Sequence, residues 1–372
     1  MRTVEQLLSR ENLEAYVKAC ETLTEDYCLE QNEVIIVPSR GANVPAILLM
    51  YGMNILEIAT KSEWYVLPFL EEYFPENSHS ILFLPFTADV SLERHEEIID
   101  AMRKYWVRVT SAFYCPPEKR IHIPEFAEFL FLLKEIESRE NVAEYYQNFP
   151  KVSKAGIIDT AISGRAIATI LKNFQQELQH EKLPIPYILI DRHGEKLKPR
   201  YTEIIGRYPK PVFSYFLPSL VTEDKGAALQ GVTAVIYVFP EYRDEELTLH
   251  CIGSWHEASG SYKEAFNMFL DLLKMILYEK SERNYKSRFE HLKEKLISLI
   301  KSRALLKPQG RFLPSIPERY EIAETRESRA HVLHVIFKES ATKRFKRDFN
   351  AYLSNMGLCA EKYFSHLSQY WF

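Results

Sequence analysis

The feature of this sequence that most constrains its fold is the alternation of short apolar runs with longer amphipathic segments. The runs are rich in β-branched and aromatic residues, which favours buried β-strands, and the segments between them carry apolar residues at helical spacing. The predicted strands are the runs 34–42 (ending in a turn), 80–86, 106–114, 154–159, 187–193, 211–217, 232–239 and 248–255. Strands that alternate with helices indicate an α/β fold, in which a mainly parallel sheet has helices on both faces.

The 372 residues exceed one compact domain of ordinary size, and the sequence pattern changes near residue 261. Helical periodicity dominates from 262 to 306 and again from 327 onward. We therefore predict an α/β domain over residues 1–260 and a helical C-terminal region over 261–372. An insertion around 115–150 would contain an acidic helical stretch from 125 to 146. A hydrophobic content of 46% is enough for a sizeable core.

The cysteines and the apolar stretches indicate the cellular compartment of the protein. The chain has five cysteines, widely spaced and without a C-x-x-C pair, which indicates reduced thiols rather than a disulfide framework. We expect no metal site built from them. The N-terminal segment mixes charges into an amphipathic pattern, unlike a signal peptide, and the longest apolar stretch is interrupted by polar residues. We therefore expect a cytoplasmic protein without a membrane span.

The charge pattern leaves two interpretations of the C-terminal helices. The net charge of −4 argues against a surface devoted wholly to nucleic acid. The C-terminal region nevertheless carries a basic cluster at Lys343, Arg344, Lys346 and Arg347. This cluster could bind a nucleic acid or a protein partner, or it could be a solvated helix face with ion pairs four residues apart, which the intermixed glutamates favour.

Two predicted strand-to-helix turns have the composition of an anion site. The first, V-P-S-R-G-A-N-V-P, places Arg40 and Gly41 after a β-branched run, and the second, I-I-D-T-A-I-S-G-R-A, places Asp159 and Gly164 similarly. Such turns expose backbone N–H groups at the positive end of a helix dipole, and glycine lets the backbone approach an anion. Turns at the carboxyl ends of parallel strands meet at one edge of the sheet. The alternative for the second turn alone is an ordinary capped loop.

Together the two turns resemble the motifs of the type I phosphoribosyltransferases. In that family a loop similar to P-x-R-G-G binds pyrophosphate, and a motif similar to D-D-T-I-S-T-G-R-T binds the 5-phosphoribosyl group. The resemblance implies a phosphoribosyl or nucleotide ligand, with Asp159 and Arg40 as catalytic residues. It implies the following ligand contacts: Ser39, Arg40, Gly41, Ala42, Asp159, Thr160, Ala161, Ile162, Ser163, Gly164 and Arg165. It also implies a glycosyltransferase reaction at ribose C1, assisted by Mg²⁺ carried on the ligand.

Two departures from the family motif bear on catalysis. Ile158 replaces the first acid of the pair, and Ala166 replaces the closing threonine. The family uses both acids to hold the ribose diol, and losing one charge-assisted contact costs on the order of 1.5–3 kcal/mol. The sequence therefore favours retained ligand binding over retained catalytic turnover. The alternatives are a nucleotide-sensing or partner-binding regulatory module, by analogy a bacterial defence effector, and a purely structural scaffold.

A third segment follows the next predicted strand. Asp191, Arg192 and His193 come directly after the run Y-I-L-I, and on a parallel sheet they would lie at the same rim as the two turns. They could contact an acceptor or Mg²⁺. A salt-bridged turn is the simpler interpretation.

Overall fold

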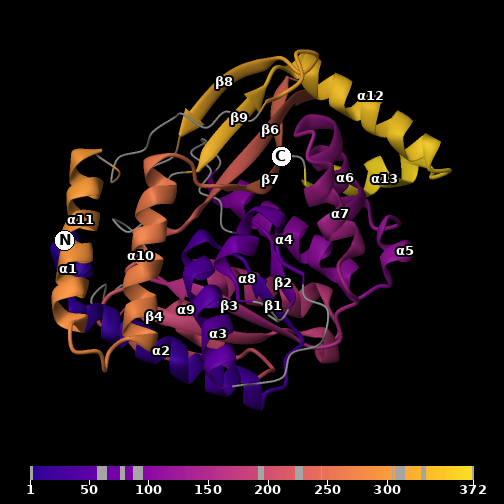
Figure 1. Ribbon diagram of the computed structural model, residues 1–372. Helices are drawn as coiled ribbons and strands as arrows, with labels where there is room; N and C mark the ends of the chain where they lie inside the picture. Colours follow the sequence, from indigo (N-terminus) through magenta and orange to yellow (C-terminus); the bar gives the residue numbers. More distant parts are fainter. Residues whose placement is uncertain are drawn as a thin grey trace.

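The protein folds around two β-sheets (Figure 1). The computed structural model describes residues 3–56, 65–75, 80–86, 95–191, 197–222, 229–243, 245–303, 305, 315–327 and 332–370. The first sheet has five parallel strands and the second has four strands in a mixed arrangement. The predicted α/β class is confirmed.

The parallel sheet has the strand order β2-β1-β3-β4-β5. Its strands are β1 (Val34–Val37), β2 (Ser80–Phe83), β3 (Ala155–Ala161), β4 (Ile185–Asp191) and β5 (Phe213–Leu217). β1 pairs with β2 on one side and with β3 on the other, where Val34 lies opposite Ala155. The residues of β1, β2 and β3 are buried throughout, which explains why these strands read as continuous apolar runs.

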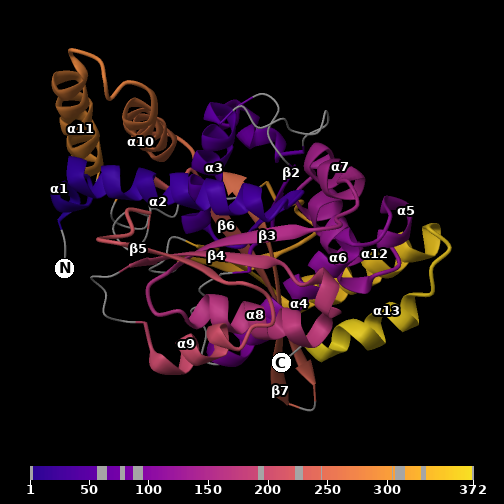
Figure 2. The same cartoon turned by 90° about the horizontal axis from the view of Figure 1, so that it is seen from below.

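Helices cover both faces of the parallel sheet (Figure 2). On one side lie α2 (Arg10–Leu29), preceded by the short α1 (Val4–Leu7), and α3 (Asn43–Ile55). On the other lie α4 (His95–Phe113), α8 (Arg165–Glu177) and α9 (Pro199–Gly206). The buried positions of α8 follow helical spacing and include Ile167, Ile170, Leu171 and Phe174.

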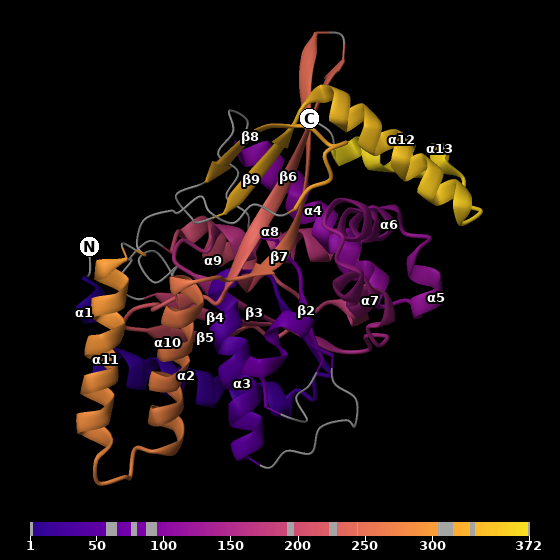
Figure 3. The same cartoon turned by 45° about the horizontal axis from the view of Figure 1, so that its top comes forward.

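The second sheet corrects the prediction that residues 232–239 and 248–255 extend the main sheet (Figure 3). They belong to β6 (Val232–Arg243) and β7 (Glu246–Glu257), an antiparallel hairpin. Both strands are longer than predicted, so only two residues connect them, and so short a connection permits only antiparallel pairing. The sheet is completed by β8 (Ile322–Glu327) and β9 (Leu333–Phe337), which lie within the C-terminal region predicted to be helical and correct that prediction for these residues.

A second correction concerns residues 106–114, predicted as a strand. They form the C-terminal half of α4 and the turn after it. Trp106, Val109, Thr110 and Phe113 are buried at helical spacing, but Tyr105 and Val107 are buried as well. Because this half of the helix is covered on most sides, its sequence loses the one-sided pattern that distinguishes a helix from a strand.

The remaining helices form two groups. The predicted insertion, at about 115–150, consists of α5 (Pro117–Arg120), α6 (Pro124–Phe131), a π-helical turn η3 (Leu132–Ile136) and α7 (Glu140–Asn148). The sequence left open whether the acidic stretch is one helix or two, and the structure has two. A helical C-terminal region is present, with α10 (Ser261–Tyr278) packed beside α11 (Tyr285–Ser302), and with α12 (Glu339–Asn355) and α13 (Ala360–Leu367) (Figure 3). Short 3₁₀ turns are η1 (Arg40–Ala42), η2 (Pro68–Tyr73), η4 (His180–Lys182) and η6 (Ser368–Tyr370). Within the described residues, no helix combines the length and the apolar character needed to cross a bilayer.

Candidate functional site

The order of the parallel strands brings the two predicted turns together. From β1 the chain moves outward to β2, and it then returns to β3 on the other side of β1. In open parallel sheets, ligands bind outside the carboxyl ends of the strands at the point where the order reverses. The turn after β1 carries Ser39 to Ala42, and the turn after β3 carries Ile162 to Gly164. Both turns therefore lie at this reversal point.

A side-chain hydrogen bond joins the first turn to β3. Ser39 Oγ donates to Asp159 Oδ1 over 2.7 Å, across 120 positions of sequence. The turn then closes as η1, where Ala42 N–H donates to Ser39 O, and Gly41 O accepts from Thr222 Oγ1 at 3.1 Å. Ser39, Arg40, Gly41 and Ala42 are all buried. The first turn is thus held from both sides by specific hydrogen bonds.

The second turn begins later than its sequence suggests. β3 extends beyond Asp159 through Thr160 to Ala161, so the acid lies inside the strand rather than at its end. Ile162 and Ser163 are half-buried, and Gly164 is the N-cap of α8 with φ +77°. Ser163 Oγ accepts from Arg165 N–H at 3.4 Å, and Ser163 O accepts from Lys198 N–H at 3.3 Å.

Gly164 is the residue whose replacement tests the shape of this turn. A Cβ added there would lie 2.6 Å from Leu197 Cδ1, and the left-handed φ is itself unfavourable for other residues. We expect Gly164→Ala to lower the free energy of unfolding by about 1–3 kcal/mol in urea titrations. Gly206→Ala is the matched control, because nothing lies within 4 Å of its added Cβ. Equal effects at the two positions would contradict the turn geometry.

Asp159 is the central ionisable group of the site. It is 1% exposed, and its Oδ2 is buried without a hydrogen-bond partner among the described residues. Burial raises the pKa of Asp159 to about 6, although hydrogen bonds from Ser39 and the Thr160 backbone and attraction from Arg103 act in the opposite direction. A carboxyl with an unused acceptor and a pKa near neutrality is the kind of group found at functional sites.

Arg103 on α4 is a site residue that the sequence reading missed. It is 5% exposed, its charge acts on Asp159, and its Nε is buried without a hydrogen-bond partner within the described parts of the chain. Burial, together with repulsion from Arg165, lowers the pKa of Arg103 to about 10. A signal did exist, because Arg103 lies on the same helical stripe as Ile99 and Trp106, both buried.

The other predicted site residues lie at the rim. Arg165 begins α8 with a side chain that is 43% exposed, and its Nη1 lies 3.5 Å from Glu96 Oε1. Asp191 ends β4, and its Oδ2 accepts a hydrogen bond from Leu220 N–H at 3.1 Å. Arg192 and His193 lie outside the described residues.

The described residues around the two turns do not form a metal centre. Across the described ranges, no three His, Cys, Asp or Glu side chains gather as metal ligands would. At the site itself, Ile158 is buried where the family motif has its first acid, which leaves Asp159 as the carboxylate of that pair. Mg²⁺ usually binds proteins through one or two carboxylates together with substrate phosphates, so at this site it would need the phosphate groups of a ligand.

The basic cluster on α12 is engaged within the protein. Lys343 pairs with Glu339 at 2.8 Å and Lys346 with Glu241 at 2.6 Å. Arg347 pairs with Asp348, and Arg344 donates to Arg319 O. These contacts favour the solvated-face interpretation of the cluster over a dedicated nucleic-acid surface.

The arrangement therefore combines two turns at a strand-order reversal, an acid with one unused oxygen, and three arginines in the same region of the molecule. Arg40 and Arg103 are buried and Arg165 is partly exposed. Such a set suits a ligand with negative charge at its ends and hydroxyl groups between them. Comparisons with family models, curated proteins and solved structures gave no match to this chain, so the site is interpreted from its own geometry.

Proposed function

We propose that the chain binds phosphoribosyl pyrophosphate or a nucleotide at the carboxyl edge of its parallel sheet. The observation that carries this proposal is the hydrogen bond from Ser39 to Asp159, which joins the first motif turn to β3, the strand that leads into the second turn, at the strand-order reversal. In this proposal the turn of residues 39–42, with Arg40, binds the pyrophosphate end. The turn of residues 162–165 binds the 5-phosphate through its backbone, and Asp159 Oδ2 accepts from a ribose hydroxyl.

The reaction associated with such a site is substitution at ribose C1. The bond from C1 to the pyrophosphate oxygen breaks, the acceptor or water forms a new bond to C1, and pyrophosphate leaves with the electron pair. The chain's own residues would contribute by holding the two phosphate ends and the ribose in fixed positions. Mg²⁺ carried on the phosphates of the ligand would offset their negative charge.

One observation favours binding without efficient turnover as the second candidate function. Ile158 is fully buried, and burial raises the pKa of the remaining acid, Asp159, to about 6, which favours its neutral form more than in an exposed aspartate. The site thus holds less negative charge for stabilising an oxocarbenium-like state than a pair of acids would. This candidate is a nucleotide-sensing or regulatory module, such as a defence effector.

The proposal is tested by titrating phosphoribosyl pyrophosphate into the protein in a calorimeter. Asp159→Asn keeps an acceptor for Ser39 but removes the charge, and we expect it to raise Kd about 10- to 100-fold. Asp271→Asn, an exposed site on α10, is the matched control and should leave Kd unchanged. If the wild type shows no binding, or if both variants bind as tightly as the wild type, the proposal fails.

Release of pyrophosphate separates the two candidate functions. The wild type is incubated with phosphoribosyl pyrophosphate and a panel of bases, and pyrophosphate is measured. Release with one acceptor identifies a transferase, and release without an acceptor identifies a hydrolase. Binding without release from any mixture favours the sensing module.

A further inference from the structure

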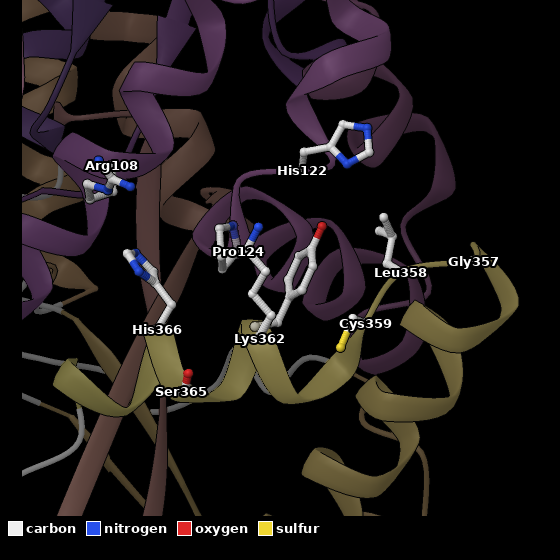
Figure 4. A pocket seen from close by; sticks show the side chains of 10 residues that line it. Arg108, His122, Pro124, Gly357, Leu358, Cys359, Lys362, Ser365 and His366 are labelled. Carbon is white, nitrogen blue, oxygen red and sulfur yellow. The ribbon is translucent and has the colours of Figure 1, made fainter.

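A pocket of about 650 Å³ lies between the helical insertion and α13 (Figure 4), and its lining includes no residue of the two motif turns. Its walls come from α4, from the start of α6 and the turn before it, and from α13 and the segment that leads into it. Small-molecule sites in proteins commonly have volumes of about 300–1,000 Å³. The pocket is therefore large enough for a small organic ligand.

The polar lining of the pocket is basic. Arg108, His122, Lys362 and His366 line it, and none of its described lining residues is Asp or Glu. Lys362 and His122 form no side-chain ion pair or hydrogen bond with any described residue, so their hydrogen-bonding capacity remains for a ligand. In Figure 4 the His366 ring points toward Arg108, and the Lys362 chain extends toward Pro124.

Two acids outside the lining, the buried Glu125 and the half-buried Glu177, fix two of these basic groups. Glu125 is fully buried, and its Oε1 lies 2.8 Å from His366 Nε2 and 3.5 Å from Arg108 Nε. Glu125 Oε1 also accepts from Tyr370 OH at 2.6 Å, and Glu177 lies 3.4 Å from Arg108 Nη1. These contacts offset part of the charge of Arg108. They also hold the donors in place before a ligand arrives, which lowers the entropy cost of binding.

Apolar residues also line the pocket, between the basic ones. Pro124, Leu358 and Tyr363 line it, and the Tyr363 ring is fixed because its hydroxyl donates to Ile121 O at 2.8 Å. A site with a few convergent polar groups among apolar residues matches the usual composition of small-molecule pockets. We propose that this pocket binds a small organic anion, in which a phosphate or carboxylate group is attached to an apolar or aromatic body.

The test uses phenyl phosphate and benzoate as probes in calorimetric titrations of the full chain. Both carry an aromatic body, so comparing them shows which anionic group the pocket prefers. We expect at least one probe to bind the wild type with Kd at or below about 1 mM. Lys362→Glu should weaken that binding at least about tenfold, because it places a negative charge where the ligand's anion would lie.

Two controls make the result specific to this pocket. Lys119→Glu reverses an exposed lysine on α5 that does not line the pocket, and it should leave the affinity unchanged. Asp159→Asn should also leave it unchanged, which separates this site from the phosphoribosyl site. Absence of binding of both probes to the wild type at about 10 mM, or equal affinity in wild type and Lys362→Glu, overturns the proposal. Loss of binding in Asp159→Asn would instead place the probe at the motif turns.

Discussion

Replacing Glu137 with glutamine is expected to lower the free energy of unfolding by roughly 3 kcal/mol at pH 7. Glu137 follows the π-helical turn, and its side chain is 0% exposed. Its Oε1 lies 2.8 Å from His256 Nε2 and accepts from the hydroxyls of Ser254 and Tyr237, while Oε2 lies 3.1 Å from Arg139 Nη1. This carboxylate therefore ties the helical insertion to both β6 and β7, and the neutral amide loses its charge-assisted contacts.

The pH dependence of the Glu137 effect follows from its pKa. Burial raises the pKa, but His256, Arg139 and Ser254 outweigh it and lower the pKa from 4.5 to about 2. A carboxyl with a depressed pKa in the folded state stabilises the fold above its unfolded pKa, and this contribution is lost as the pH falls through the folded pKa. The difference in the free energy of unfolding between wild type and Glu137→Gln should thus have its full size above about pH 5 and should shrink steadily toward pH 2.

Urea unfolding curves at several pH values between 7 and about 2.5 measure this difference. The matched control is Glu144→Gln, an exposed glutamate on α7, for which we expect a change within about 0.5 kcal/mol. If the difference in the free energy of unfolding stayed constant down to the lowest pH, the charge of Glu137 would not be the cause. A loss of packing alone does not depend on pH.

Three strands of the main sheet, β1, β2 and β3, could be predicted from sequence because they are buried throughout and therefore form continuous apolar runs. Residues 34–37, 80–83 and 155–159 were found for this reason. The second sheet could not be predicted in the same way. β8 is largely exposed, with the pattern I-A-E-T-R-E, and its pairing with β9 and β6 depends on contacts far apart in the chain.

In the candidate site too, local sequence predicts the turn residues but not the side chains that packing brings to them. Gly164 could be predicted from the sequence as a turn residue, because its left-handed φ favours glycine. The position of Arg103 beside Asp159 depends on the packing of α4 against α8, which no local pattern specifies. The burial of Glu125, Glu128 and Glu137 was equally hidden, since in sequence they look like a solvated acidic helix. Their partners come from β6, β7 and the C-terminal residues.

Arg120, like Glu137, is a buried charged residue whose hydrogen bonds hold the helical insertion together. It ends α5, is fully buried, and lies over the ring of Phe113 at 5.0 Å. Its Nη1 donates to Tyr146 O at 3.3 Å and Gln147 O at 3.1 Å, and its Nη2 donates to Pro150 O at 3.1 Å. These carbonyls belong to the last turn of α7 and the segment after it, which have no continuing helix to satisfy them.

Arg120→Met is therefore expected to lower the free energy of unfolding by about 3–4 kcal/mol, since it leaves three carbonyls without their charged donor. The thioether side chain has similar length, so most of the loss would come from the hydrogen bonds rather than from a cavity. Urea unfolding followed by circular dichroism measures the change, with Lys119→Met as the control at the exposed neighbouring position. Arg120→Lys should recover only part of the loss, because one ammonium group cannot reproduce the planar fork that spans these carbonyls. Full recovery by lysine, or a loss no greater than that of Lys119→Met, would show that the carbonyl contacts do not stabilise the end of α7.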